Sequence, residues 1–394
     1  MREAEIGQLP GFDSDLAELE AEGLRREIFV CPESLINLSS NDYLGLSNHP
    51  DVIKAGREAL ERFGAGGTSS RLLAGTRKPH EELEEDLARF LGKETALVYS
   101  SGYHANTGIL PALASSGDLI LFDRLCHASI IDGIRLSSAR FFSFEHNSLA
   151  DLEKKLIEKR PSYRRTFIVT EGIFSMDGDR SPIPALANLS RRFDSLLYVD
   201  EAHSFGVFGP DGRGLAAEVG ALQDIPIFVG TLSKALGSQG GFVACDGNVR
   251  DLLVSRSRSF LYSTSLAPAC AAAARESLRL LPKLEERRAR IHRASIDLRR
   301  RLVQFGFSVL ESSSQIIPVW AGDVETTNRM SAHLFKSGFF VPSIRPPTVP
   351  PGEGRVRISV AHDAAAGGIE KIAAAFKNFG ERPARRREKI VQGV

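Results

Sequence analysis

Two features of the sequence predict an α/β fold, with a mostly parallel sheet covered by helices on both faces. Between Ala96 and Cys245, short aliphatic and aromatic runs alternate with longer amphipathic segments, as strands and helices do in parallel sheets. The short runs lack strict polar alternation, as expected when both faces of a sheet are covered. The expected strands are Ala96–Tyr99, Leu119–Phe122, Phe167–Thr170, Leu196–Val199, Ile227–Gly230 and Phe242–Cys245. The expected helices between or after them are Leu149–Lys159, Ile183–Arg192 and Asp246–Arg256.

The segments on either side of this block have a different pattern of apolar residues. The segment after it mixes strands and helices and predicts a smaller C-terminal α+β domain. We expect an N-terminal arm over residues 1–44, a large α/β domain over 45–283 and the α+β domain over 284–394. The helices expected outside the central block are Asp13–Arg26, Ala267–Arg279, Leu284–Phe305, Thr326–Lys336 and Gly367–Phe379. The strands expected there are Leu35–Leu38, Phe307–Leu310, Ile316–Trp320 and Val356–Val360.

Composition and charge exclude several classes of protein. The 394 residues include 50 basic and 49 acidic side chains, a balance that provides no field for attracting nucleic acid or an anionic membrane. No apolar run approaches the ~20 residues that span a bilayer. Four widely spaced cysteines indicate reduced thiols, and the acidic start Met1–Glu5 does not resemble a signal peptide. We therefore expect a cytoplasmic protein, with the charged tail Glu381–Lys389 in solvent.

Polar residues follow three of the expected strands, where ligands of parallel sheets bind. Asp200 and His203 follow Leu196–Val199, and Thr231 and Lys234 follow Ile227–Gly230. The third group begins at Ser101 after Ala96–Tyr99 and opens a helix. These residues combine an acid, a base, a lysine and a helix N-terminus at one rim of the sheet.

This set is suited to pyridoxal phosphate. Lys234 can bind the cofactor's aldehyde through its amine, and Asp200 can keep the pyridine nitrogen protonated. The helix N-terminus at Gly102 and Tyr103 can bind the phosphate, with a hydroxyl added by Thr231. His203 can hydrogen-bond the phenolic oxygen.

Each of these residues alone also has an ordinary structural explanation. A lysine in a loop is usually solvated, an aspartate after a strand often caps a helix, and His127 and His203 could be partly buried structural histidines. The stretch Asp200–His203 also matches a magnesium-binding box of helicases, but the chain lacks the phosphate loop which that interpretation requires. No spacing of His or Cys indicates a metal site.

Seven stretches taken in order resemble the α-oxoamine synthases, a branch of the fold-type I pyridoxal-phosphate transferases. They are Asn41–Leu46, Ser101–Asn106, His127–Gly133, Glu171–Asp179, Val199–Ser204, Thr231–Ala235 and Tyr262–Thr264. The resemblance implies that Lys234, His127 and Asp200 are catalytic, with His127 stacked on the cofactor ring. It implies that Ser175 and His203 contact the phenolic oxygen, and that Gly102, Tyr103 and Thr231 bind the phosphate together with Thr264 of a second subunit. It further implies a homodimer and a substrate carboxylate held by Asn41 and Arg357.

The stretch Arg345–Pro350 (RPPTVP) is similar to the loop of the biotin-pathway member of that family. It implies condensation of L-alanine with a pimeloyl thioester, carried by coenzyme A or by an acyl carrier protein, with Thr348 in the substrate site. Two alternatives stay open: a sister enzyme that uses glycine or serine with another acyl-CoA, and a catalytically silent partner subunit. The sequence does not reveal the role of the loop Gly64–Gly75 or the residue that meets the distal carboxylate.

Overall fold

The computed structural model describes residues 12–383, and its main element is a seven-stranded sheet. The sequence expectations for Met1–Glu5 and for the tail beyond residue 383 lie outside these residues. In spatial order the strands are β2 (Thr95–Tyr99), β8 (Gly241–Cys245), β7 (Ile227–Thr231), β6 (Leu196–Asp200), β5 (Arg165–Glu171), β3 (Asp118–Asp123) and β4 (Arg140–Phe144). In this sheet β8 runs antiparallel to both of its neighbours, and the other pairs are parallel. The predicted mostly parallel sheet is confirmed.

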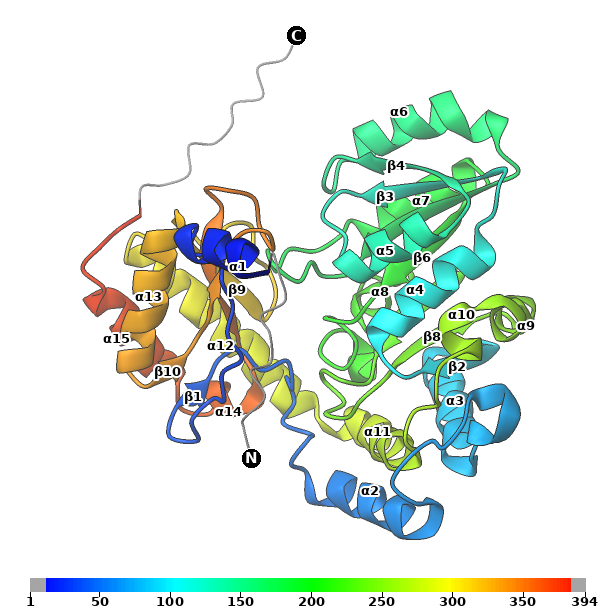
Figure 1. Ribbon diagram of the computed structural model, residues 1–394, viewed down its shortest axis with the longest axis horizontal. Helices are drawn as coiled ribbons and strands as arrows, with labels where there is room; N and C mark the ends of the chain where they lie inside the picture. Colours follow the sequence, from blue (N-terminus) through cyan, green and yellow to red (C-terminus); the bar gives the residue numbers. More distant parts are fainter. Residues whose placement is uncertain (1–11, 384–394) are drawn as a thin grey trace, which may run out of the picture.

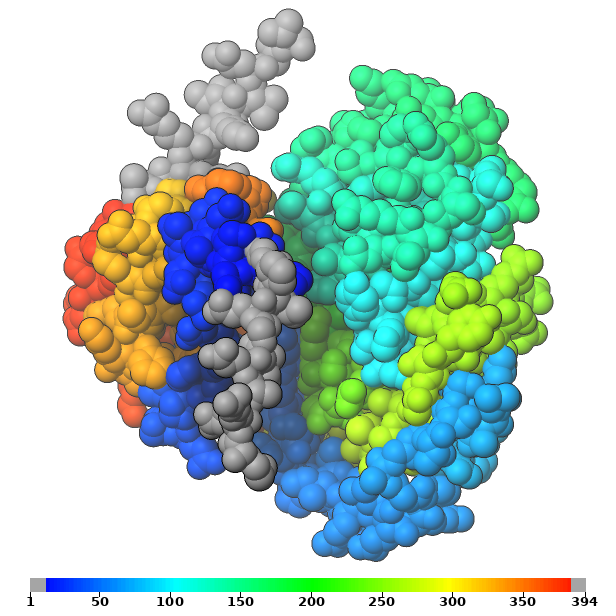
Figure 2. Space-filling model, in the orientation of Figure 1, coloured from blue at the N-terminus to red at the C-terminus, as the bar shows by residue number. Residues whose placement is uncertain are grey.

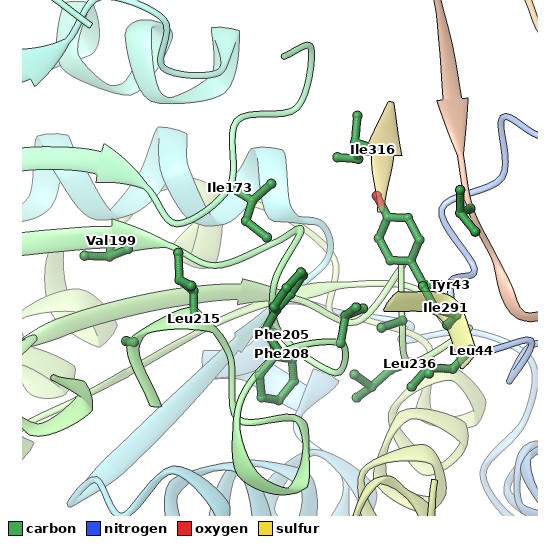
Figure 3. Packing of buried hydrophobic residues seen from close by; sticks show 14 of the residues in the cluster. Tyr43, Leu44, Ile173, Val199, Phe205, Phe208, Leu215, Leu236, Ile291 and Ile316 are labelled. Atoms are coloured by element: carbon green, nitrogen blue, oxygen red, sulfur yellow. The ribbon is translucent and has the colours of Figure 1, made fainter. Parts of the chain in front are cut away.

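Both faces of this sheet are buried by helices, which explains the unbroken apolar runs. Phe167 and Val169 of β5 pack into one hydrophobic cluster and Ile168 into the other, because successive residues of a strand point to opposite faces. One face is covered by α4 (Gly102–Leu113), α5 (Ala128–Leu136), α9 (Gly247–Arg256) and α10 (Arg258–Leu261). The other is covered by α3 (Lys78–Leu91), α6 (Leu149–Lys159), α7 (Ile183–Arg192), α8 (Leu215–Glu218) and α11 (Pro268–Leu280). Figure 3 shows part of the second cluster, including Phe205 and Phe208.

A second unit stands beside the large one (Figures 1 and 2). Its antiparallel sheet has the order β11 (Ser343–Ile344), β12 (Gly354–Ser359) and β9 (Ile316–Gly322). Its helices are α12 (Glu285–Gln304), α13 (Val324–Lys336), α14 (His362–Ala365) and α15 (Ile369–Asn378). The N-terminal α1 (Phe12–Ala21) lies on this unit in Figure 1. The short strand β1 (Ile36–Asn37) pairs in parallel with β10 (Phe339–Phe340).

The chain passes from the arm to the large unit through a loop and α2 (Pro50–Phe63), which packs on α11. A short π-helical turn, Arg71–Gly75, then leads into α3. We propose domain boundaries after residues 44 and 283, because the arm pairs with the C-terminal unit and α12 begins that unit's helical layer.

Three local predictions were wrong. Phe307–Leu310 forms no strand, because Gly306 and Leu310 have positive φ angles of 88° and 53°, which bend the chain out of the sheet. The N-terminal helix ends at Ala21, because Gly23 has a φ of 65°, a conformation that stops helices. The edge strand β4 was missed, because its first residues Arg140 and Phe141 are exposed and give no apolar run.

Candidate active site

Lys234 lies in the loop after β7 and is held by a buried hydrogen-bonded chain. Its Nζ lies 2.8 Å from Nε2 of His203, whose Nδ1 lies 2.7 Å from the hydroxyl of Tyr43. Asn41 Oδ1 is 3.2 Å from the same hydroxyl and 3.5 Å from both terminal nitrogens of Arg357. Residues from the arm, the sheet rim and β12 therefore meet in one line of polar contacts.

Burial brings the pKa of the Lys234 amine closer to neutral pH. Burial lowers the pKa of Lys234 to about 8, and Arg357 acts in the same direction, whereas Asp200 and Glu171 oppose the shift. Burial, and after it the charge of Lys234, lowers the pKa of His203 well below its ordinary value. The imidazole is therefore neutral, and the lysine amine can give or take a proton near neutral pH.

Asp200 ends β6 and is fixed by a second network. Its Oδ2 accepts a hydrogen bond of 2.8 Å from Asn106 Nδ2, and its Oδ1 accepts one of 2.9 Å from the backbone N–H of Ala202. The same Asn106 amide donates to Ser129, which lies 2.8 Å from Nδ1 of His127. The carboxylate and the His127 ring are thus oriented by one asparagine of α4.

Glu171 is a buried carboxyl beside Asp200, since the two residues are paired across β5 and β6. Burial and the charge of Asp200 raise the pKa of Glu171 well above its ordinary value. Its Oε1 accepts a hydrogen bond of 2.5 Å from the backbone N–H of His127. Glu171 therefore binds its proton more readily than an exposed glutamate does, beside the carboxylate of Asp200.

The helix N-terminus of α4 and the hydroxyl of Thr231 face the same space. A side chain at Gly102 would begin 3.6 Å from Thr231 Oγ1, so the missing Cβ leaves room between them. The first N–H groups of a helix lack partners within it and favour an anion. Thr231 Oγ1 donates to Gly240 O at 2.9 Å and lies 2.7 Å from Ser233 Oγ. With an amine at Lys234 and a carboxylate at Asp200, this donor set fits the phosphate, aldehyde and pyridine nitrogen of pyridoxal phosphate.

The remaining predicted residues have different surroundings. Arg357 is buried and donates 2.5 Å to the carbonyl of Ser175 and 2.9 Å to Ser359 Oγ. Tyr103 opens α4 beside Gly102, and its hydroxyl donates 2.6 Å to Asp132. Thr348, in the proline loop, accepts 2.9 Å from Arg26 and has no described contact with the Lys234 chain.

The loop Gly64–Gly75 packs against the segment that carries Thr264. Ser70 and Thr264 form a β-bridge, and Ser265 N–H donates 2.9 Å to Ser69 O. A Cβ at Gly67 would lie 2.3 Å from Ser265 O, so this contact requires glycine. Ser100 Oγ, next to the start of α4, donates 2.9 Å to Thr264 O. The glycine loop thus holds the Thr264 segment at the mouth of the site.

Sequence reasoning assigned no role to Tyr43, Asn106, Ser129 or Glu171. All four lie within the stretches that carried the family resemblance, which was the available signal. Among residues 12–383, no cluster of three His, Cys, Asp or Glu side chains could hold a metal ion. Nor does this part of the chain include a helix with the length and apolar character needed to cross a membrane.

Comparisons with known proteins identify related sequences and structures. The family model described as aminotransferase class I and II matches residues 33–373. The 8-amino-7-oxononanoate synthase of Geobacter sulfurreducens is 44% identical over 380 residues, covering 93% of this chain and 97% of its own. The serine palmitoyltransferase of S. paucimobilis, solved with bound pyridoxal phosphate joined to myriocin, has a TM-score of 0.87 at 33% identity, with 93% and 96% of the chains covered. The 8-amino-7-oxononanoate synthase of Francisella tularensis has a TM-score of 0.76 at 28% identity, with 88% and 97% covered.

Proposed function

The chain belongs to the class I and II aminotransferase family, as an α-oxoamine synthase that uses pyridoxal phosphate, and we propose that it condenses L-alanine with a pimeloyl thioester to 8-amino-7-oxononanoate in biotin biosynthesis. Carbon dioxide and the free thiol are the other products. The observation that carries the proposal is the line from Lys234 through His203, Tyr43 and Asn41 to Arg357. It brings an amine with a pKa of about 8 and a guanidinium into one site, as an amino-acid substrate requires.

When bound, the cofactor supplies an electron sink that makes the Cα–H of an attached amino acid acidic. In our proposal the amine of Lys234 would hold the cofactor through its aldehyde, and as a free amine it would take the Cα proton of alanine. Asp200, oriented by Asn106, holds the proton on the pyridine nitrogen. His127 would stack on the cofactor ring and would polarise the thioester oxygen.

The remaining contacts to the cofactor follow from the same placement. Gly102, Tyr103 and Thr231 would bind the phosphate, and His203 and Ser175 the phenolic oxygen. Arg357 and Asn41 would hold the alanine carboxylate, because a guanidinium can donate two parallel hydrogen bonds to it.

The distal carboxylate of the pimeloyl group needs a cation of its own. Arg26 is exposed and donates 2.9 Å to Thr348 of the proline loop. We propose that Thr348 contacts the substrate and holds this guanidinium ready for the carboxylate. A long acyl chain without a terminal charge would form no ion pair with Arg26 and would gain no binding affinity from it.

We also propose that two copies form a homodimer around the site. Large apolar side chains are exposed near its mouth, including Leu73 at 83% and Tyr262 at 73%. Exposed apolar patches of this kind support protein contacts. The neighbouring Thr264 is exposed on the same segment, so it could reach the phosphate site of the partner. The proposal places the enzyme in the cytoplasm.

Two other functions deserve a test. The likeness to serine palmitoyltransferase favours a sister enzyme that joins glycine or serine to another acyl-CoA. A silent partner subunit is disfavoured by the presence of Lys234 with its low pKa.

The experiment measures thiol release with L-alanine, glycine or L-serine, each combined with pimeloyl-CoA, a pimeloyl carrier protein or palmitoyl-CoA. We expect alanine with a pimeloyl thioester to be the fastest pair. The wild-type protein should have a visible band that borohydride abolishes, and Lys234→Ala should lack both the band and turnover. A faster reaction of serine with palmitoyl-CoA would refute the substrate assignment, and a colourless wild-type protein after addition of pyridoxal phosphate would refute the whole proposal.

A further inference from the structure

Tyr43 is a fully buried phenol between the two halves of the site. It belongs to the same hydrophobic cluster as Phe205 and Phe208, beside Leu44 and Ile316 (Figure 3). Its hydroxyl lies 2.7 Å from Nδ1 of His203 and 3.2 Å from Oδ1 of Asn41. No described hydrogen bond joins it to Lys234, but Arg357 and Gln315 also form side-chain hydrogen bonds with its oxygen. Its effect on the lysine therefore passes through His203 and the residues around it.

The hydroxyl and the neutral imidazole carry one proton each, and this allows two arrangements. In the first, Tyr43 donates to Asn41, His203 donates from Nδ1 to the Tyr43 oxygen, and Nε2 is left as an acceptor for Lys234. In the second, Tyr43 donates to Nδ1, and Nε2–H points at Lys234. An ammonium group has three donors and no lone pair, so a charged Lys234 is compatible with the first arrangement and is repelled by the second.

We propose that Tyr43 is a positioning residue that fixes His203 as the Nδ1–H tautomer, so that Nε2 accepts a hydrogen bond from Lys234 and holds the amine in place. The acceptor for the Tyr43 proton is Asn41, which is also in contact with Arg357. The position of the lysine is therefore linked to the pair proposed to bind the substrate carboxylate. This inference rests on the proposed function for the role of Lys234.

Other charged groups also act on Lys234, and Arg357 among them also interacts with the Tyr43 hydroxyl. Asp200 and Glu171, from the ends of β6 and β5, favour the ammonium form, and Arg357 of β12 opposes it. His127 from the start of α5 also interacts with Lys234. Because Arg357 interacts with both the Tyr43 oxygen and Lys234, the effect of removing this oxygen is interpreted together with a direct measurement of the His203 tautomer.

The test is the pH dependence of pyridoxal phosphate uptake by cofactor-free protein, followed by visible absorbance. Uptake needs the neutral amine, so the wild-type rate should have its midpoint near pH 8. In Tyr43→Phe the Nδ1–H tautomer loses its buried acceptor, and the ammonium loses a reliable partner. The midpoint should fall by about half to one pH unit, as expected for loss of one hydrogen bond to a charged form.

Tyr99→Phe is the matched control. Tyr99 is also a buried phenol, and its hydroxyl donates 3.2 Å to Ser257, so the same atom is removed without touching His203. Its uptake midpoint should equal that of the wild type. A Tyr43→Phe midpoint within 0.2 pH units (about the error of such a titration) of the control overturns the inference.

A second measurement works on the wild type alone and covers the case in which Tyr43→Phe does not fold. Nitrogen NMR of histidine-labelled protein at pH 7 distinguishes the two tautomers, with the His203 signal assigned by its loss in His203→Gln. We expect a protonated Nδ1, and a protonated Nε2 overturns the inference. If the wild type takes up no cofactor, the proposed function fails, and the tautomer still decides the role of Tyr43.

Discussion

His146 joins two buried carboxylates and fixes the loop that carries Ser175. Its Nδ1 is 3.0 Å from Asp123 at the end of β3, and its Nε2 is 2.8 Å from Asp179. Burial alone would lower the pKa of His146, but hydrogen bonds and charge from both aspartates outweigh it and raise the pKa to about 10. The loop from Ile173 to Ser181 thus depends on a permanent histidine cation.

The stabilisation that the charged His146 provides can be estimated from the change in its pKa. The gap between the ordinary pKa of 6.5 and about 10 corresponds to about 5 kcal/mol. The side chain keeps 18% of its surface exposed, and solvent screening reduces the estimate to about 3 kcal/mol. Removing one partner of a buried pair typically costs ~3–5 kcal/mol, so the two estimates agree. We expect His146→Gln to lower the free energy of unfolding by about 3 kcal/mol at pH 7.

The stability lost in His146→Gln should be larger at low pH than at high pH. The folded pKa of His146 is raised, so its stabilisation is complete below pH 6.5 and disappears as the pH rises through about 10. Urea unfolding at pH 7 and pH 10.5, followed by circular dichroism and by the single tryptophan, Trp320, measures the difference between wild type and variant. At pH 10.5 the difference should shrink to below about 1 kcal/mol.

His292→Gln is the control for this measurement. His292 Nε2 is 3.0 Å from Val207 O, and burial lowers the pKa of its ring, so it is neutral at both pH values. Its loss should cost about 1 kcal/mol at pH 7 and at pH 10.5. Equal destabilisation of His146→Gln at the two pH values would refute the argument that a charged histidine holds the loop.

Two further predictions concern the chemistry. Asp200→Asn keeps the hydrogen-bonding shape but removes the charge, so pyridoxal phosphate should still bind. The barrier to exchange of the alanine α-proton, measured by proton NMR in deuterated buffer, should rise by ~3–4 kcal/mol. Exchange at the wild-type rate would show that Asp200 is only a structural cap. Arg357→Lys keeps the positive charge but loses two-pronged donation, so alanine binding, titrated by absorbance, should weaken by ~1–3 kcal/mol with cofactor affinity unchanged. An equal loss of cofactor affinity would contradict the assignment of Arg357 to the substrate carboxylate.

Secondary structure was predicted best where the local sequence signals for a helix or strand agree with the burial pattern of the segment. The helix over Leu149–Lys159 was predicted residue for residue, because the side chain of Ser148 caps it and apolar residues recur on one face. The strand β4 could not be predicted, since an exposed edge strand needs no apolar run. The expected strand at Phe307–Leu310 failed because Leu310 has a positive φ, a conformation that its residue type does not predict.

The site was predictable where residues follow strands and unpredictable where they reach it from elsewhere. Asp200 ends β6, His203 follows it, and Lys234 follows β7; Lys234 and His203 lie 2.8 Å apart. Asn106 lies inside α4 and reaches back to Asp200, a contact that depends on how the helix docks. Tyr43 is an aromatic residue in a loop, and its hydroxyl becomes part of the site through the pairing of distant segments.

The pairing of β1 with β10 has a consequence for the order in which the enzyme is made. Ile36 leaves the ribosome long before its partner Phe339. Contacts between such distant residues form slowly, and domains tend to fold as units during synthesis. The last strand of the large unit's sheet ends at Cys245, so this unit can fold before β10, the partner strand of the arm, has been made. Asn41 and Tyr43 lie in the arm just after β1, so the newly made enzyme completes its proposed substrate pocket only after Phe339 and Phe340 have been translated.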